Sequence, residues 1–311
     1  MTDHIAATSV RPAVAGYAPA IVRAETRKAS PKVERVAAAL GAEIHNVALA
    51  NAVEDDDLFA EIRTLLFQHK VLFFRDQDIS PAAHVAFGRR LGKPVTHPQM
   101  PTHPAHPELL MMYRDEQKRP PTNVWHTDGS FLGEPPSAFV LRCVICPEVG
   151  GDTMWANMAL AYARLPEDIK ERIGGLYAKH SFEHIFGGDS SPEDRAKMRA
   201  VNPMVEHRVV RTHPETGEKI LYVNQEYTTH FSNFKSTTEM RYGQDFTIEA
   251  TNLLVYLMRQ VEIPEFQVRL RWRPNTIAIW DNIATQHYAI HDFYPAVRHM
   301  TRVGVVGGKP C

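Results

Sequence analysis

The segment NVWHTDGSF contains the two side chains whose types and spacing most clearly suggest chemistry. In an extended strand, His126 and Asp128 project from the same face because they are two positions apart. Gly129 then allows the chain to turn close to whatever the pair binds. An imidazole and a carboxylate on one face can supply two adjacent ligands to a metal ion. The HxD pattern is unspecific by itself, because a chain with 16 histidines often contains it by chance.

The C-terminal part of the chain supplies a third candidate ligand. In WDNIATQHYAIHDFYPAVRHMTR, an apolar strand is followed by His287 and then by a strand that carries Arg298 and Arg302. These two arginines share a face and span roughly 13 Å, at about 3.3 Å per residue. Inward-facing arginines are costly unless they meet anions, and a guanidinium group binds both oxygens of a carboxylate. The segment therefore predicts a metal ligand beside one or two anion-binding positions.

The combination of ligands favours one metal over another. Two histidines and one carboxylate leave three coordination positions open, which is typical of non-haem Fe(II) sites that activate dioxygen. Zinc held by the same side chains is the physical alternative, and it would leave a water for hydrolysis. A zinc hydrolase gives no role to the two arginines, so iron is preferred. A non-catalytic cupin-like binding protein is a second alternative, although decayed ligands would then be expected.

The elements that must position these residues follow from periodicity and from capping signals. Helical spacing covers residues 54–70, and a second helix has Ser80 as its N-cap, Pro81 at its first position and Gly92 at its end. A third helical region covers 158–174 and restarts at Pro166. Strands are expected at 123–131, 137–146, 152–156, 176–185, 207–212, 219–224, 267–272, 276–281 and 298–306.

Many strands with uneven connections and a few early helices predict a mainly β fold with peripheral helices, specifically a double-stranded β-helix or jelly roll. A doubly wound sheet fits less well, because the helices do not alternate regularly with the strands. Residues 1–32 show little periodicity and are expected to form a mobile or docked N-terminal arm. Residues 33–311 show no compositional break, so a single catalytic domain is expected there.

The composition excludes several classes of protein. The chain is 44% hydrophobic and 23% charged, with a formal net charge of -1, so nothing in its charge favours nucleic acid or an anionic membrane as a partner. No apolar run approaches the roughly 20 residues that cross a bilayer. The N-terminus lacks the pattern of a secretory signal, and three cysteines do not make a disulfide framework. We therefore expect a soluble, cytoplasmic protein.

A CxxC pair and several further histidines are also residue types that can bind metals. Cys143 and Cys146 form a CxxC, but the surrounding SAFVLRCVIC is typical of a buried strand, where residues three apart face opposite sides. Both cysteines are therefore expected to be structural. His213 lies in the turn-like THPETGEK, and His103 and His106 lie in a Pro-rich loop. These histidines are expected to be packed or solvated residues and not ligands.

The ordered set of segments resembles the taurine dioxygenase family, which also contains the alkylsulfatase and phenoxyalkanoate dioxygenases. From LGAEIHNVAL onward its markers are HKVLFFRDQ, WHTDGSF, GGDTMWANM, RTHPETGEKILYVN, WDNIATQHYA and RHMTR. The resemblance implies a double-stranded β-helix that uses Fe(II) as cofactor and 2-oxoglutarate as co-substrate. It also implies hydroxylation of a substrate carbon, coupled to decarboxylation of 2-oxoglutarate to succinate and carbon dioxide. The implied partners are a small organic anion and dioxygen, and we expect the chain to form a homo-oligomer.

The resemblance also assigns roles to single residues. It implies three metal ligands and a pair that holds the distal carboxylate of 2-oxoglutarate. It also implies a further arginine near the first carboxylate of 2-oxoglutarate, which belongs to the co-substrate site and helps to hold an anionic substrate. In that order, the matching residues are His126, Asp128 and His287, then Thr153 and Arg298, then Arg302.

The residues that would recognise the substrate depart from the taurine pattern. His97 matches a histidine that contacts the sulfonate, but Met100 replaces a tyrosine, and Thr122 stands where an asparagine receives the amine. Ile185 replaces a serine before the pocket phenylalanine, here Phe186. Taurine itself is therefore not expected. A less polar sulfonate, sulfate ester, carboxylate or aryloxyalkanoate is predicted. The residues expected to line its site are His97, Met100, Phe131, Ile185, Phe186 and Arg302.

Overall fold

The computed structural model describes residues 30–310, except 97–99, 120–122 and 236–246. Of the arm predicted at residues 1–32, positions 1–29 lie outside the described residues. Lys32 already belongs to the first strand. Residues Pro31–Cys311 form one compact unit. None of the helices in the described part has the length and apolar character that crossing a bilayer requires.

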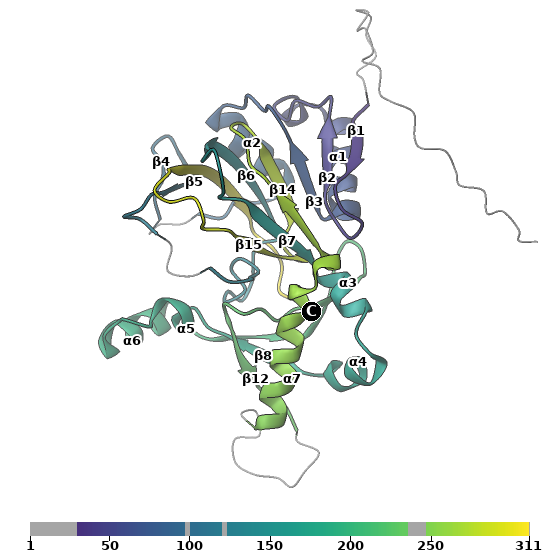
Figure 1. The fold of residues 1–311 in the computed structure, drawn as a ribbon, viewed down its shortest axis with the longest axis vertical. Coiled ribbons are helices and arrows are strands. Elements are labelled where there is room, and N and C mark those ends of the chain that lie inside the picture. Colours follow the sequence, from purple (N-terminus) through teal and green to yellow (C-terminus); the bar gives the residue numbers. More distant parts are fainter. Residues whose placement is uncertain (1–29, 97–99, 120–122, 236–246, 311) are drawn as a thin grey trace, which may run out of the picture. The chain divides into compact units, whose positions relative to one another are not determined.

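An eight-stranded sheet forms the centre of this unit (Figure 1). Its neighbouring strands are antiparallel, except that the strand at Ala42–His45 runs parallel to the strand at Val71–Phe74. VLFF at residues 71–74 is buried at all four positions, as expected for a central strand. In spatial order the strands are β1 (Lys32–Arg35), β2 (Ala42–His45), β3 (Val71–Phe74), β14 (Ile277–Asp281), β6 (Ala138–Ile145), β16 (Arg298–Val305), β5 (His106–Arg114) and β4 (Thr102–His103).

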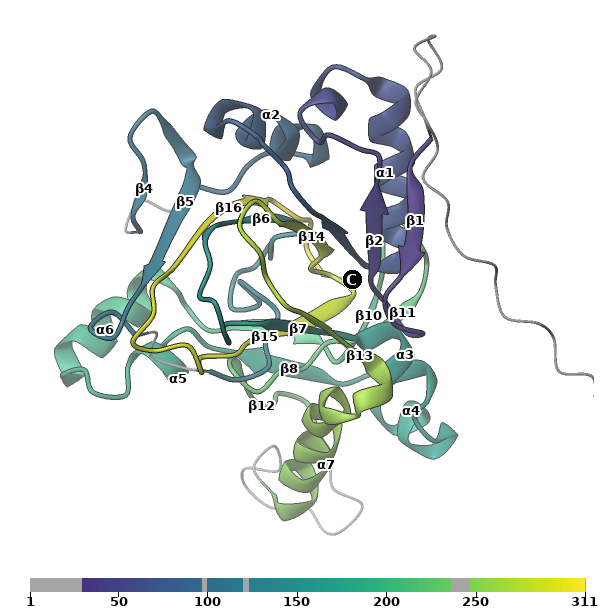
Figure 2. The same ribbon diagram turned by 45° about the horizontal axis from the view of Figure 1, so that its top comes forward.

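A second sheet packs against the inner face of the first (Figure 2). It consists of β13 (Gln267–Leu270), β7 (Thr153–Asn157) and β15 (Thr285–Ala289), with β7 in the middle. Trp155 of β7 is fully buried between the sheets, with its ring 5.6 Å from Phe73 and 5.8 Å from Trp280. The neighbours of Trp155 on β7 contact a different core on the outer side, as strand alternation requires.

Helices cover the outer face of the main sheet. α1 (Asp56–His69) buries Ile62 and Leu66 against it, and α2 (Pro81–Leu91) packs beside α1. The Ser80 hydroxyl accepts a hydrogen bond from the backbone N–H of Ala83 at 3.1 Å, so the predicted cap is confirmed. The third helical region divides at Pro166, as predicted. Its two parts are α3 (Met158–Ala163) and α4 (Glu167–Ile173).

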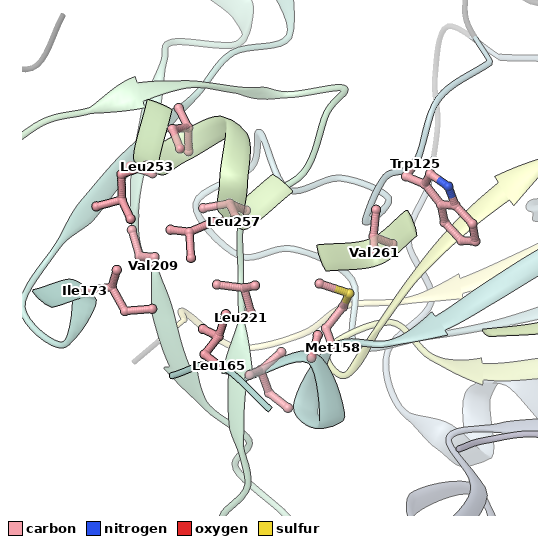
Figure 3. Packing of buried hydrophobic residues seen from close by; sticks show 14 of the residues in the cluster. Trp125, Met158, Leu165, Ile173, Val209, Leu221, Leu253, Leu257 and Val261 are labelled. Atoms are coloured by element: carbon pink, nitrogen blue, oxygen red, sulfur yellow. The ribbon is translucent and has the colours of Figure 1, made fainter. Parts of the chain in front are cut away.

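A further layer lies on the outer side of the second sheet. There α7 (Ile248–Met258) packs Leu253 and Leu257 against Val209, Leu221 and Ile173 (Figure 3). The short elements of this layer and of the connections are β8 (Tyr177–His180), β9 (Val205–Arg208), β10 (Val210–Thr212), β11 (Lys219–Leu221), β12 (Thr228–Phe231), α5 (Glu183–Phe186), α6 (Pro192–Val201), η1 (Asn51–Val53), η3 (Arg259–Glu262) and η4 (Pro264–Phe266).

Three strand predictions need correction, and one long strand was missed. The strand predicted for 207–212 divides at Val209 into β9 and β10, which belong to different sheets. Residues 123–131 form a single bridge at His126 followed by turns, because Gly129 has a φ of +70° that an extended strand does not allow. The strand predicted for 176–185 ends at His180, and the chain then forms α5. β5 was not predicted, because HPELLMMYR lacks a regular alternation of apolar and polar residues.

The CxxC pair differs from the expectation because of an irregularity in β6. Met300 lies opposite Cys143, and the preceding residue of β16, His299, lies opposite Ile145, so Val144 is an extra, bulged residue. A bulge reverses the alternation of side chains, which returns Cys146 to the side of Cys143. The two thiols hydrogen-bond, and this contact raises the pKa of Cys143 and lowers that of Cys146 to about 7. The thiols therefore do not point apart, although Cys143 is a buried core residue as expected.

Candidate active site

One antiparallel bridge brings together two side chains that are far apart in sequence. The backbone N–H of His126 donates to the carbonyl of His287 at 3.1 Å, and the reverse hydrogen bond is 2.8 Å. Residues directly opposite in such a pair project from the same face. The two imidazole rings accordingly lie with centroids 4.1 Å apart. His287 is on β15, so the second sheet carries one of the candidate ligands.

A tight turn places the third candidate ligand beside this pair. Gly129 adopts a φ of +70°, and a Cβ atom there would lie 2.6 Å from Cδ of Pro136. No other residue type fits this close approach without displacement. The turn holds Asp128 with one carboxylate oxygen 3.7 Å from Nε2 of His126 and the other 3.6 Å from Nε2 of His287.

The spacing and chemistry of these three donors fit a metal ion. With metal–donor bonds of about 2.1 Å, two donors on one ion are about 3.0 Å apart at a right angle and about 4.2 Å apart when opposite. The distances from Asp128 to the two histidines fall between these limits. Within the described residues, this is the one cluster of three or more His, Cys, Asp or Glu side chains whose ligand atoms lie within 4.8 Å of one another. Two imidazoles and one carboxylate suit ferrous iron.

The two histidines have different electrostatic surroundings. Burial by itself would lower the pKa of His126, but the buried carboxylate of Glu226, 3.0 Å from Nδ1, and the nearby Asp128 raise it to about 9. Burial lowers the pKa of His287 well below its ordinary value, and the neighbouring His126 adds to this effect. His287 therefore remains neutral and offers a free lone pair, as a metal ligand must.

A threonine and an arginine next to the cluster form a separate polar site. Nη2 of Arg298 donates to the hydroxyl of Thr153 at 3.2 Å, and Nε1 of Trp272 donates to the same oxygen at 2.9 Å. Arg298 is 8% exposed, and its Nε has no hydrogen-bond partner among the described residues. A buried guanidinium with an unused donor fits a carboxylate, which can take two hydrogen bonds from it. The predicted neighbourhood of Thr153 and Arg298 is therefore present.

Two more arginines make this end of the site positive. Arg302 forms an ion pair with Asp128. Arg114 of β5 lies directly opposite Arg298, and like charges in such a pair repel each other. Burial lowers the pKa of Arg298, and repulsion from Arg114 contributes. The site therefore has more positive charge than Asp128 neutralises, and an anionic ligand would stabilise it.

Buried polar contacts hold the end of β14 and the turn that leads from it to β15, the strand that carries His287, and they were not predicted from the sequence. Nε2 of His213 lies 2.8 Å from a carboxylate oxygen of Asp281, and both side chains are almost fully buried. Nδ2 of Asn282 donates to the carbonyls of Asp128 at 3.0 Å and Pro136 at 2.8 Å. His213 is a packed residue outside the donor cluster, in agreement with the expectation that it is not a ligand, because its turn folds back onto Asp281. The signal that could have been used is the polar pair in the otherwise apolar IAIWDN.

Comparison with known proteins agrees with this geometry. A family profile described as "Taurine catabolism dioxygenase TauD, TfdA family" matches residues 28–303. The chain belongs to this family. The resemblance inferred from the motifs is therefore confirmed, and the chain is a 2-oxoglutarate-dependent dioxygenase that uses Fe(II).

Relatives of this TauD/TfdA-family chain cover nearly its whole length. An alpha-ketoglutarate-dependent sulfate ester dioxygenase from Pseudomonas putida is 36% identical, over 89% of this chain and 90% of that protein. An alkylsulfatase from Acinetobacter baylyi is 35% identical, over 89% and 85%. The crystal structure of a taurine dioxygenase from Burkholderia xenovorans superposes with a TM-score of 0.74 and 33% identity, over 90% of this chain and 92% of that one.

The predicted substrate residues are only partly brought together. The ring of Phe131 lies 4.9 Å from Phe182, which stacks on Phe186 at 4.4 Å, so these three form an aromatic wall. Ile185 lies beside this wall on α5, whereas Met100 is 44% exposed. His97 lies outside the described residues. Phe182 was not singled out from the sequence.

Proposed function

We propose that this dioxygenase hydroxylates an organic sulfate ester at the carbon that bears the sulfate, and so releases the sulfate. Bound Fe(II) and 2-oxoglutarate supply the oxidation of that carbon by dioxygen, with succinate and carbon dioxide as the other products. A hydroxylated carbon that carries a sulfate collapses to an aldehyde, and the C–O bond to sulfate breaks. The observation that carries the proposal is the donor cluster of His126, Asp128 and His287 beside the Thr153–Arg298 pair.

Each residue of the site has a defined task in this proposal. The cluster of His126, Asp128 and His287 holds Fe(II) on one side and leaves the other side open. Thr153 and Arg298 bind the distal carboxylate of 2-oxoglutarate and thereby orient it. Arg302 holds the substrate anion near the metal in this proposal, and its ion pair with Asp128 supports that role. Holding the reacting carbon in place is the main contribution that the protein makes to the rate.

The preference for a sulfate ester over taurine rests on the relatives and on the wall of the site. Two relatives with at least 35% identity bear names that refer to sulfate esters or alkylsulfates. The wall formed by Phe131, Phe182 and Phe186 offers apolar surface for an alkyl chain. Thr122 stands at the position of the asparagine that receives the taurine amine, and the polar contacts for a small zwitterion are mostly missing from the sequence. His97 remains a proposed contact for the anion.

The architecture and assembly are proposed as follows. The eight-stranded sheet and the β13–β7–β15 sheet share one core, which supports a double-stranded β-helix within a single catalytic domain at residues 33–311. Ile248, Val255 and Tyr256 of α7 are exposed apolar side chains, which supports a homo-oligomer. A cytoplasmic location is proposed because Fe(II) and 2-oxoglutarate are supplied there.

The test is to incubate the enzyme with alkyl sulfates of increasing chain length and to measure succinate and sulfate together. We expect equal amounts of both products, and no sulfate when Fe(II), 2-oxoglutarate or dioxygen is omitted. Taurine at the same concentration is the matched comparison and should yield little succinate. Sulfate release without 2-oxoglutarate would indicate a hydrolase, and stronger succinate formation with taurine would contradict the substrate class.

A further inference from the structure

A buried carboxylate lies on the far side of one candidate metal ligand. Glu226 is 4% exposed, and one of its carboxylate oxygens lies 3.0 Å from Nδ1 of His126. The backbone carbonyl of Val124 lies 2.9 Å from the same nitrogen. Glu226 is outside the donor cluster and faces the edge of the imidazole that points away from Asp128.

This arrangement determines which nitrogen of the ring is free. Both neighbours of Nδ1 are oxygen atoms that can only accept, so Nδ1 must carry the proton. The lone pair of the neutral ring is then on Nε2, the atom that faces Asp128 at 3.7 Å. The contacts made by Nδ1 thus present the correct nitrogen of His126 to a metal.

His287 shows how unusual this contact is within the site. Its Nδ1 is buried and has no hydrogen-bond partner among the described residues. Its ring is held by packing instead, with the centroid 5.2 Å from that of Trp280. Among the described residues, a carboxylate therefore contacts Nδ1 of His126 but not Nδ1 of His287.

The loop that carries Glu226 is itself fixed. The side-chain oxygen of Asn224 accepts from the N–H of Tyr227 at 2.9 Å, and its Nδ2 donates to the hydroxyl of Ser130 at 2.9 Å. The Tyr227 hydroxyl hydrogen-bonds with Glu226, while its ring packs 5.0 Å from that of Phe131. A buried carboxylate is costly, so it must be compensated by such contacts.

We propose that Glu226 is a positioning residue for His126, which orients the imidazole and strengthens metal binding through its negative charge. This inference rests on the proposed role of His126 as a metal ligand. Through Tyr227 and Phe131, the same carboxylate joins the metal site to the aromatic wall of the substrate site. Contacts of this kind typically change metal affinity by about 10- to 100-fold.

The experiment measures the binding of Co(II) alone to the metal-free protein, by competition with a coloured chelator and from the visible Co(II) spectrum. Glu226→Ala should weaken binding by about 10- to 100-fold and shift the spectrum. Glu226→Gln keeps an oxygen acceptor and should recover part of the affinity. Gln225→Ala is the matched control, because that side chain donates to Glu262 and not to the site. Its affinity should equal that of the unmodified protein.

His126→Ala distinguishes a failure of the proposed ligand set from a failure of the proposed role of Glu226. If this variant binds Co(II) normally, the proposed ligand set fails. If His126→Ala loses binding while Glu226→Ala keeps its affinity within about twofold and an unchanged spectrum, the role of Glu226 is refuted. Should Glu226→Ala not fold, Glu226→Gln decides alone. A shifted spectrum with weaker binding supports the role, and an unchanged spectrum and affinity overturn it.

Discussion

Replacing Arg298 by lysine isolates the contribution of its planar guanidinium group. Arg298 is nearly fully buried and uses Nη2 for Thr153, and its Nε has no partner in the described part of the chain. It can therefore give two hydrogen bonds to the carboxylate of 2-oxoglutarate. Lysine keeps the charge but cannot give this paired contact. The loss of one charge-assisted hydrogen bond costs about 1.5–3 kcal/mol. At about 1.4 kcal/mol per factor of ten, the KM for 2-oxoglutarate should rise about 10- to 150-fold.

The assay follows succinate formation while 2-oxoglutarate and the organic substrate are varied separately. The KM for 2-oxoglutarate should rise in Arg298→Lys, while the KM for the organic substrate and kcat at saturation change little. Arg271→Lys is the matched control, because the side chain of Arg271 is exposed and donates to the carbonyl of Glu148. An unchanged KM for 2-oxoglutarate, or a rise confined to the KM of the organic substrate, would refute the assignment of Arg298.

Three further predictions test other parts of the site and the core. Gly129→Ala should weaken Co(II) binding and lower Tm, because left-handed backbone costs about 1–2 kcal/mol and the new Cβ would contact Pro136. Gly133→Ala is the control and should do neither, because a Cβ there has no atom within 4 Å. Thr153→Val should destabilise the protein by about 1–3 kcal/mol for each buried donor that it leaves without an acceptor, whereas Thr153→Ser keeps the hydroxyl and should not. Equal melting temperatures of the Thr153→Val and Thr153→Ser variants would count against this prediction. Burial lowers the pKa of His84 to about 4, so its contribution to stability is complete above pH 6.5 and is lost as the pH falls toward 4. The unfolding free energy of His84→Gln should therefore depend less steeply on pH in this window than that of the unmodified protein, by up to about 1.4 kcal/mol per pH unit. An identical slope in the two proteins would contradict this prediction.

The donor cluster of His126, Asp128 and His287 was predictable because its residue types and local spacing are restricted. His126 and Asp128 stand two apart before a glycine that must turn, and His287 follows an apolar strand. The helix that begins at Ser80 was predictable for a similar reason, since its cap and Pro81 act locally. In each case the physical cause lies within a few residues of the pattern.

Features that depend on contacts between distant segments were not predictable in this way. Glu226 is an ordinary glutamate in its own segment, and only the fold brings it to His126. The bulge at Val144 depends on pairing with β16, and it reverses the side on which Cys146 lies. Arg114 likewise faces the site because β5 pairs with β16. Tertiary pairing decided each of these positions.

A crystal structure with Mn(II) and the 2-oxoglutarate analogue N-oxalylglycine would test the metal centre directly. We predict one ion bonded at about 2.1 Å to Nε2 of His126, a carboxylate oxygen of Asp128 and Nε2 of His287. The distal carboxylate of the analogue should contact Thr153 and Arg298. An ion bound without His287, or an analogue whose distal carboxylate lies away from Arg298, would contradict the account.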